Sequence, residues 1–101
     1  MENIIIGTKD NLDSLISNGK TTLIDFWAPW CGPCKTLGPL LDIIAGENPE
    51  IQIIKVDVDE NSELSSQYGI RSIPAVFIFK NGEKTDMFVG MKSKEEILKL
   101  I

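Results

Sequence analysis

The sequence contains no histidine, few basic residues and only two cysteines. The absence of histidine excludes Ser-His-Asp and Cys-His nucleophilic catalysis, and it removes the commonest zinc ligand. Ten Lys and Arg residues stand against fifteen Asp and Glu residues, which gives a formal net charge of −5. A nucleic-acid binder needs a basic face that releases counterions from phosphates, so this charge argues against that class of protein.

Long hydrophobic runs are also missing. Residues 1–3 carry no basic side chain, and the apolar run Ile4–Ile6 is far too short for a signal peptide or a membrane span. We therefore expect a cytoplasmic protein that does not bind membranes. In that compartment the thiol pool keeps cysteines reduced, so a cysteine pair is more often catalytic or metal-binding than structural.

The chain has an ordinary balance of 43% hydrophobic and 25% charged residues over a length of 101. This balance predicts one domain, residues 1–101, that buries its own core. Apolar, β-branched runs predict five strands, at residues 3–6, 21–27, 51–58, 75–79 and 84–89.

Four amphipathic segments, each opened by a capping residue or a helix-opening proline, predict helices. They begin at Thr8, at residues 31–33, at Asn61 and at Ser93, which forms a capping box with Glu96. Strands that alternate with helices predict an α/β fold with a parallel sheet covered on both faces. Asn81-Gly82 predicts a final hairpin that adds an antiparallel pair.

Cys31 and Cys34 lie three residues apart at the start of the second predicted helix. Residues at this spacing share a helix face, so the two sulfurs are able to bond. Unpaired amides and the helix dipole at this end favour an anion at Cys31, and a thiolate is the form that attacks disulfides. The pattern therefore favours redox chemistry.

Three other interpretations of the cysteine pair carry less weight. A structural disulfide closing so short a loop constrains the unfolded chain little. A zinc site needs about four ligands, and without histidine only carboxylates could complete it. Buried cysteines acting as small hydrophobes are common singly, but not as a pair around Gly32-Pro33 beside Trp30.

The segment 25–35, Asp-Phe-Trp-Ala-Pro-Trp-Cys-Gly-Pro-Cys-Lys, resembles the active-site segment of thioredoxins. Further matches follow in order along nearly the whole chain, at Pro39, Lys55, Asp59 and residues 68–74, 79–82 and 89–90. The resemblance implies the thioredoxin fold, a five-stranded mixed sheet flanked by four helices. One departure is Gly38, where the family more often has alanine.

The same resemblance implies a dithiol–disulfide oxidoreductase that reduces cytoplasmic protein disulfides through a redox-active Cys31–Cys34 pair. A thioredoxin reductase, linked to NADPH or to ferredoxin, would return the pair to its dithiol form. No bound cofactor and no metal are expected, and the protein is expected to be a monomer.

Asp25 interrupts an apolar strand between Ile24 and Phe26. Burial there raises the pKa of a carboxyl group, and a carboxyl that titrates near neutrality is able to move protons in catalysis. The alternative is a structural carboxylate satisfied by hydrogen bonds. The resemblance places Asp25 beneath Cys34 with Lys55 nearby, and so favours the catalytic role.

The resemblance also assigns roles around the cysteines. From its position, Trp30 is expected to contact substrate, because it lies in the loop next to Cys31, and Trp27 is expected to pack behind the motif that Gly32 and Pro33 support. For both tryptophans the alternative is a core aromatic. A cis Ile73-Pro74 bond would let the Ile73 backbone pair with an extended substrate segment. Gly90 would keep this groove open, or else serve as a strand-end turn.

Two other functions compete with this one. A disulfide oxidase or isomerase usually works outside the cytoplasm and often carries histidine between its cysteines, whereas Gly32-Pro33 stands here. A binding module could use the same surface without turnover, but the intact Cys31, Cys34, Asp25 and Pro74 argue against lost catalysis.

Overall fold

Strands and helices alternate along the computed structural model of the chain, which describes residues 2–101. The strands are β1 (Ile4–Ile6), β2 (Thr22–Trp27), β3 (Gln52–Asp57), β4 (Ala75–Lys80) and β5 (Glu83–Val89). The helices are α1 (Leu12–Ile16), α2 (Gly32–Glu47), α3 (Ser62–Gln67) and α4 (Lys94–Leu98). Every predicted strand and helix is present. No helix within residues 2–101 is long and apolar enough to cross a membrane.

The five strands form one mixed sheet in the order β1-β3-β2-β4-β5. β1, β3 and β2 are parallel, whereas β4 is antiparallel to β2 and β5 is antiparallel to β4. The mixed sheet that the resemblance implied is therefore confirmed, with both β4 and β5 running antiparallel to their neighbours. α3 and the loop after it stay at the end of the sheet where β2 finishes, because Ala75, the first residue of β4, pairs with Phe26.

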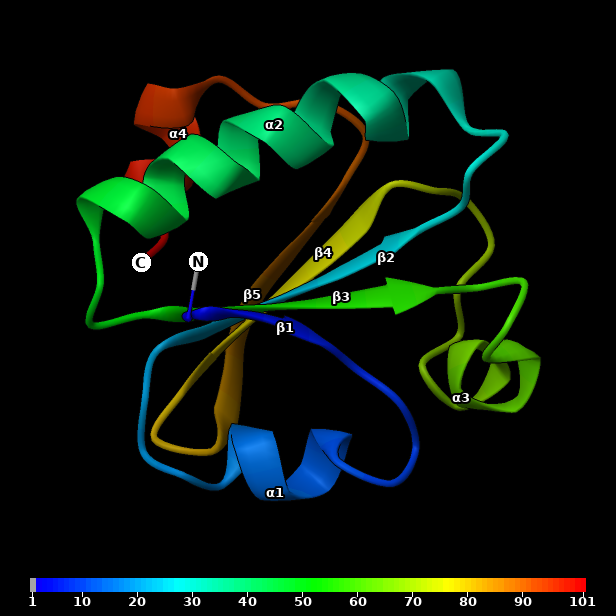
Figure 1. Ribbon diagram of the computed structural model, residues 1–101, viewed down its shortest axis with the longest axis horizontal. Helices are drawn as coiled ribbons and strands as arrows, with labels where there is room; N and C mark the ends of the chain where they lie inside the picture. Colours follow the sequence, from blue (N-terminus) through cyan, green and yellow to red (C-terminus); the bar gives the residue numbers. More distant parts are fainter. Residues whose placement is uncertain (1) are drawn as a thin grey trace.

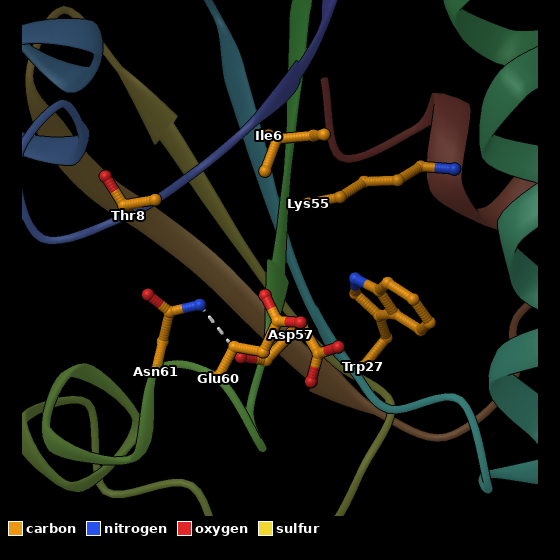
Figure 2. A pocket seen from close by; sticks show the side chains of 7 residues that line it. All are labelled: Ile6, Thr8, Trp27, Lys55, Asp57, Glu60 and Asn61. Atoms are coloured by element: carbon orange, nitrogen blue, oxygen red, sulfur yellow. Dashed lines mark hydrogen bonds between the residues drawn. The ribbon is translucent and has the colours of Figure 1, made fainter.

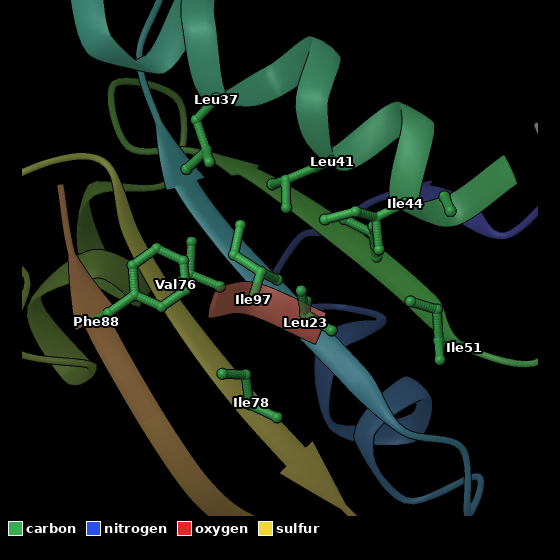
Figure 3. Close-up of a cluster of buried hydrophobic side chains, with 11 residues drawn as sticks. Leu23, Leu37, Leu41, Ile44, Ile51, Val76, Ile78, Phe88 and Ile97 are labelled. Atoms are coloured by element: carbon green, nitrogen blue, oxygen red, sulfur yellow. The ribbon is translucent and has the colours of Figure 1, made fainter. Parts of the chain in front are cut away.

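Helices cover both faces of the sheet, with α2 and α4 on one face and α1 and α3 on the other (Figure 1). Side chains alternate along β2, so Leu23 joins the core under α2 while Ile24 and Phe26 join the core on the opposite face. Figure 3 shows the first of these cores, in which Leu41 of α2 and Ile97 of α4 meet side chains of the sheet. The residues of the candidate site described below come from this sheet and from the helix α2 that covers it.

Two predicted helix caps are wrong in detail. The Thr8 hydroxyl accepts a hydrogen bond from the Asp10 N–H (3.2 Å), and the Thr8 N–H donates to Asn11 Oδ1 (2.8 Å), so Thr8 closes a turn before α1 rather than capping it. Asn61 does precede α3, but its side chain donates to the Asp57 carbonyl (2.9 Å) and makes no cap bond. Both side chains prefer a local backbone partner to a helix N–H.

Other local signals are confirmed. Ser93 and Glu96 form both halves of the capping box of α4. Asn81 and Gly82 have positive φ values of 53° and 81°, which a type I′ hairpin turn requires. Gly69 follows Tyr68, the C-cap of α3, and has a φ of 67°, as a C′ glycine does.

Candidate active site

Cys31 occupies the N-cap of α2, and Cys34 lies one turn inside it. Their sulfurs are bonded, their Cα atoms are 5.3 Å apart, and each residue is 5% exposed. The Cys34 N–H donates to Cys31 Sγ at 3.2 Å. Gly32 and Pro33 form the exposed first turn between them, and proline is suited to that turn because it has no N–H to leave unpaired.

The start of α2 also sets the electrostatics at Cys31. The first amides of a helix have no partner within it, and the helix dipole places partial positive charge at this end. Both effects favour a thiolate over a thiol when the bond is reduced. The amide of Cys34 is already directed at Cys31 Sγ, so a negative charge on that sulfur would have an N–H donor without any rearrangement of the helix.

Asp25 lies in β2, two residues after Leu23, and therefore on the face that α2 covers. It is 2% exposed, and its Oδ1 accepts no hydrogen bond from residues 2–101. Burial raises the pKa of Asp25 to about 6, while the nearby Lys55 ammonium lowers it and the Asp42 carboxylate raises it. A carboxyl with this pKa exchanges protons near neutral pH.

Lys55 lies in β3 directly beside Asp25, because the two residues are register partners in the parallel pair β2–β3. Its Nζ donates to Asp42 Oδ1 of α2 at 2.8 Å. The structure therefore brings Asp25 and Lys55 together, as expected, but gives the ammonium group a different carboxylate as its direct partner.

The two tryptophans have different surroundings. Trp30 is 67% exposed, and its Nε1–H donates to Asp59 Oδ2 at 2.8 Å, which excludes the core alternative for this residue. Trp27 is half-buried and packs against the buried cluster of Ala28 and the two cysteines. It also lines a pocket of about 360 Å³, drawn in Figure 2, whose other lining residues are Ile6, Thr8, Lys55, Asp57, Glu60 and Asn61.

Residues 73, 74 and 90 lie together beside the cysteines. The Ile73–Pro74 bond is cis, as the resemblance implied. Cys31 Sγ lies 3.8 Å from the Ile73 carbonyl oxygen, and the Gly90 N–H donates to the Pro74 carbonyl at 2.8 Å. The loop before β4 and the end of β5 are thus joined next to Cys31.

Two acidic residues of the site were not assigned roles from the sequence. Asp42 contacts Lys55, and Asp59 contacts Trp30. A signal for Asp42 was available, because Cys34, Gly38 and Asp42 are spaced four apart and so share one helix face. The partner of Asp42 could not be found this way, since Lys55 comes from a separate strand.

Comparison with known proteins agrees with this geometry. The thioredoxin family model matches residues 3–101. The chain belongs to the thioredoxin family. The thioredoxin of Mycoplasmoides gallisepticum is 44% identical over 96 residues, covering 95% of this chain and 96% of that protein. Thioredoxin 1 of Nostoc sp. is 55% identical over 73 residues, covering 71% and 68%.

The thioredoxin fold is shown by solved structures as well. A point mutant of the thioredoxin from Halobacterium salinarum matches with a TM-score of 0.87 and 36% identity, covering 97% of this chain and 86% of that one. The Plasmodium falciparum thioredoxin matches with a TM-score of 0.84 and 33% identity, covering 95% and 94%. The predicted fold and family are therefore confirmed.

Family membership and the bonded Cys31–Cys34 pair define the chemistry. The chain is a dithiol–disulfide oxidoreductase with protein-disulfide reductase activity. The thioredoxin family uses no prosthetic cofactor, because a cysteine pair itself carries two electrons. Within residues 2–101, no three His, Cys, Asp or Glu side chains are grouped as a metal site.

Proposed function

We propose that residues 1–101 act as a single domain that reduces protein disulfides, with Cys31 as the attacking thiol, Cys34 as the resolving thiol and Asp25 as the proton acceptor. The observation that carries this assignment is the Cys34 N–H, which donates to Cys31 Sγ at 3.2 Å at the first turn of α2. That contact stabilises negative charge on Cys31 and not on Cys34.

In the first step, the Cys31 thiolate attacks one sulfur of a substrate disulfide. The substrate S–S bond breaks, a mixed disulfide forms with Cys31, and the other substrate sulfur leaves as a thiolate. After this step one substrate sulfur is bonded to Cys31. The second step releases that sulfur and completes the transfer of two electrons.

In the second step, Cys34 passes its proton to the Asp25 carboxylate and attacks Cys31 Sγ. The mixed disulfide breaks, the Cys31–Cys34 bond forms, and the second substrate sulfur leaves. Asp25 supports this role because its pKa of about 6 leaves it ionised at neutral pH yet able to accept a proton.

The remaining site residues support these steps. Gly32 and Pro33 hold the first turn of α2, Trp27 packs against the cysteine cluster, and Lys55 adjusts the charge around Asp25. Substrate would lie against Trp30, Ile73, Pro74 and Gly90. The exposure of Trp30 and the closeness of the Ile73 carbonyl to Cys31 Sγ support this placement.

The oxidised pair must be reduced again before another turnover. We propose a thioredoxin reductase, drawing on NADPH or on ferredoxin, as the electron donor, and membership of the thioredoxin family supports it. A cytoplasmic location and a monomeric state belong to the same proposal. A coupled assay with an NADPH-linked and a ferredoxin-linked reductase would identify the donor, because only the productive pair sustains many turnovers on a protein disulfide.

The assignment of the two cysteines is tested by trapping. Cys34→Ser should accumulate a covalent complex with a disulfide-bonded protein through Cys31, because the resolving thiol is missing. Cys31→Ser is the matched control and should trap far less. Intact mass spectrometry after alkylation measures both, and equal trapping by the two variants would contradict the assignment.

A further inference from the structure

We propose that Asp42 is a positioning residue for the second step: by pairing with Lys55 it holds the ammonium group under α2 and keeps Asp25 a stronger proton acceptor. This inference rests on the proposed role of Asp25. Asp42 lies about two helical turns beyond Cys34, so it would act through Lys55 and not on the reacting sulfurs.

On α2, the residues that lead from Cys34 to Asp42 form a row on one face of the helix. Cys34, Gly38 and Asp42 are four residues apart along α2, so they lie one turn above another on one face. Cys34 is buried at one end of the row, whereas Asp42 is half-buried at the other. The row therefore leads from the resolving cysteine to the carboxylate that pairs with Lys55 of β3.

The Lys55 ammonium group comes from the sheet and lies between Cys34 and Asp42 along this row. Asp25 and Lys55 are register partners, so their side chains leave the sheet on the same face. A Cβ atom added at Gly38 would lie 3.9 Å from Lys55 Nζ, which locates the ammonium group against the middle of the row. Figure 2 shows the Lys55 side chain extending from β3 toward α2.

Several carboxylates could pair with the Lys55 ammonium group, and in the structure its partner is Asp42. Lys55 Nζ lies 2.8 Å from Asp42 Oδ1, and the side chains are 22% and 42% exposed. The other carboxylates around Lys55 are its register partner Asp25 on β2 and the pair Asp57 and Glu60, which line a pocket with it. The β4 partner of Asp25 is the apolar Val76. Without Asp42, the Lys55 ammonium group would interact instead with the carboxylates of the sheet, Asp25 among them.

The choice of partner matters for proton transfer. A cation beside Asp25 favours its carboxylate form and weakens it as a base, while an anion has the opposite effect. The effects of Lys55 and Asp42 on the pKa of Asp25 have these signs. Asp42 therefore offsets Lys55, and Asp25 takes the proton from Cys34 Sγ while that sulfur displaces the substrate sulfur from Cys31.

The test compares Asp42→Asn with Glu47→Gln in the same helix. Glu47 pairs with Lys94 of α4, so the control removes an equal charge and an equal type of ion pair away from Asp25. The readouts are the Asp25 carboxyl titration by 13C NMR in the reduced protein and the pH profile of mixed-disulfide resolution by stopped flow. Asp42→Asn should lower both midpoints by about half a pH unit, and Glu47→Gln should move neither.

Two further variants separate positioning from a direct charge effect. Asp42→Glu keeps the charge and should return the midpoints toward the original values. In a Lys55→Met background, Asp42→Asn should have less than half of its original effect, because the ammonium group that it positions is gone. An unreduced effect in that background, or a titration unchanged by Asp42→Asn, would overturn the inference.

Asp25→Asn distinguishes this inference from the proposed function. If it leaves the pH profile of resolution unchanged, Asp25 is not the proton acceptor and both proposals about catalysis fail. If it abolishes the profile while Asp42→Asn shifts neither midpoint, the role of Asp25 stands and that of Asp42 alone is overturned.

Discussion

At the scale of single residues, Asp25 links folding to the redox site. Its carboxyl group is 2% exposed, and burial raises its pKa from 3.8 to about 6. The folded state therefore binds this proton more tightly than the unfolded state does. Below pH 3.8 both states hold the proton and the shift has no effect, whereas stability falls as the pH rises toward 6 and then levels off.

Asp25→Asn should therefore stabilise the protein at neutral pH. We expect the free energy of unfolding of the oxidised protein to rise by roughly 3 kcal/mol at pH 7 and to change little at about pH 3.5. Denaturant titration at both pH values measures this difference. Asp10→Asn, at an exposed position, is the control and should be neutral at both. A gain from Asp25→Asn that is the same at both pH values would refute the burial argument.

At the scale of elements, two glycines with different backbone conformations should respond in opposite ways to replacement by alanine. Gly38 lies inside α2, where an added Cβ would make an ordinary contact 3.9 Å from Lys55 Nζ. Gly82 sits in the β4–β5 turn with φ of 81°, a conformation that L side chains rarely adopt.

Gly38→Ala should raise the free energy of unfolding by about 0.5–1 kcal/mol, because alanine is the better helix residue. Gly82→Ala should lower it by more than about 1 kcal/mol, because its backbone must be strained. Thermal and urea unfolding of the two variants gives the comparison. Loss of stability in Gly38→Ala would mean that the ammonium group of Lys55 cannot accommodate the new methyl group.

These elements also explain which features were predictable from sequence. The Ser93–Glu96 box and the Asn81-Gly82 turn depend on neighbours in the chain, so residue types alone predicted them. The direction of β4 depends on where α3 places the chain relative to β2, and no nearby residue encodes that. Thr8 resembled a cap, but Asp10 and Asn11 supply its partners.

The site divides in the same way. Cys31 and Cys34 were singled out by their spacing, and Asp25 by a charge in an apolar strand. The bonds from Lys55 to Asp42 and from Trp30 to Asp59 join residues from different elements, so spacing in the chain could not reveal them. Their geometry depends on the register between β2 and β3 and on how α2 packs on the sheet.

At the scale of the whole molecule, the sheet separates two cores that share no side chain. Ile44 of α2 belongs to the core on one face, and Ile16 of α1 belongs to the core on the other. Removing one methylene group from each should therefore give independent losses of packing.

We expect Ile44→Val and Ile16→Val to lower the free energy of unfolding by about 0.5–1.5 kcal/mol each. The double variant should equal the sum of the two losses within about 0.5 kcal/mol. Urea unfolding of the four proteins in the cycle measures the coupling. A larger coupling would show that strain passes through the sheet from one core to the other.

The two ends of the described chain also share a location. Ile4, near its start, and Ile101, at its end, both pack against the core under α2. Figure 1 shows both ends on the side of the molecule away from the first turn of α2, where the cysteines lie. A tag, a solid support or a linked second protein attached at either end would be held behind the molecule, so the cysteine pair would still face outward toward a bulky disulfide-bonded partner.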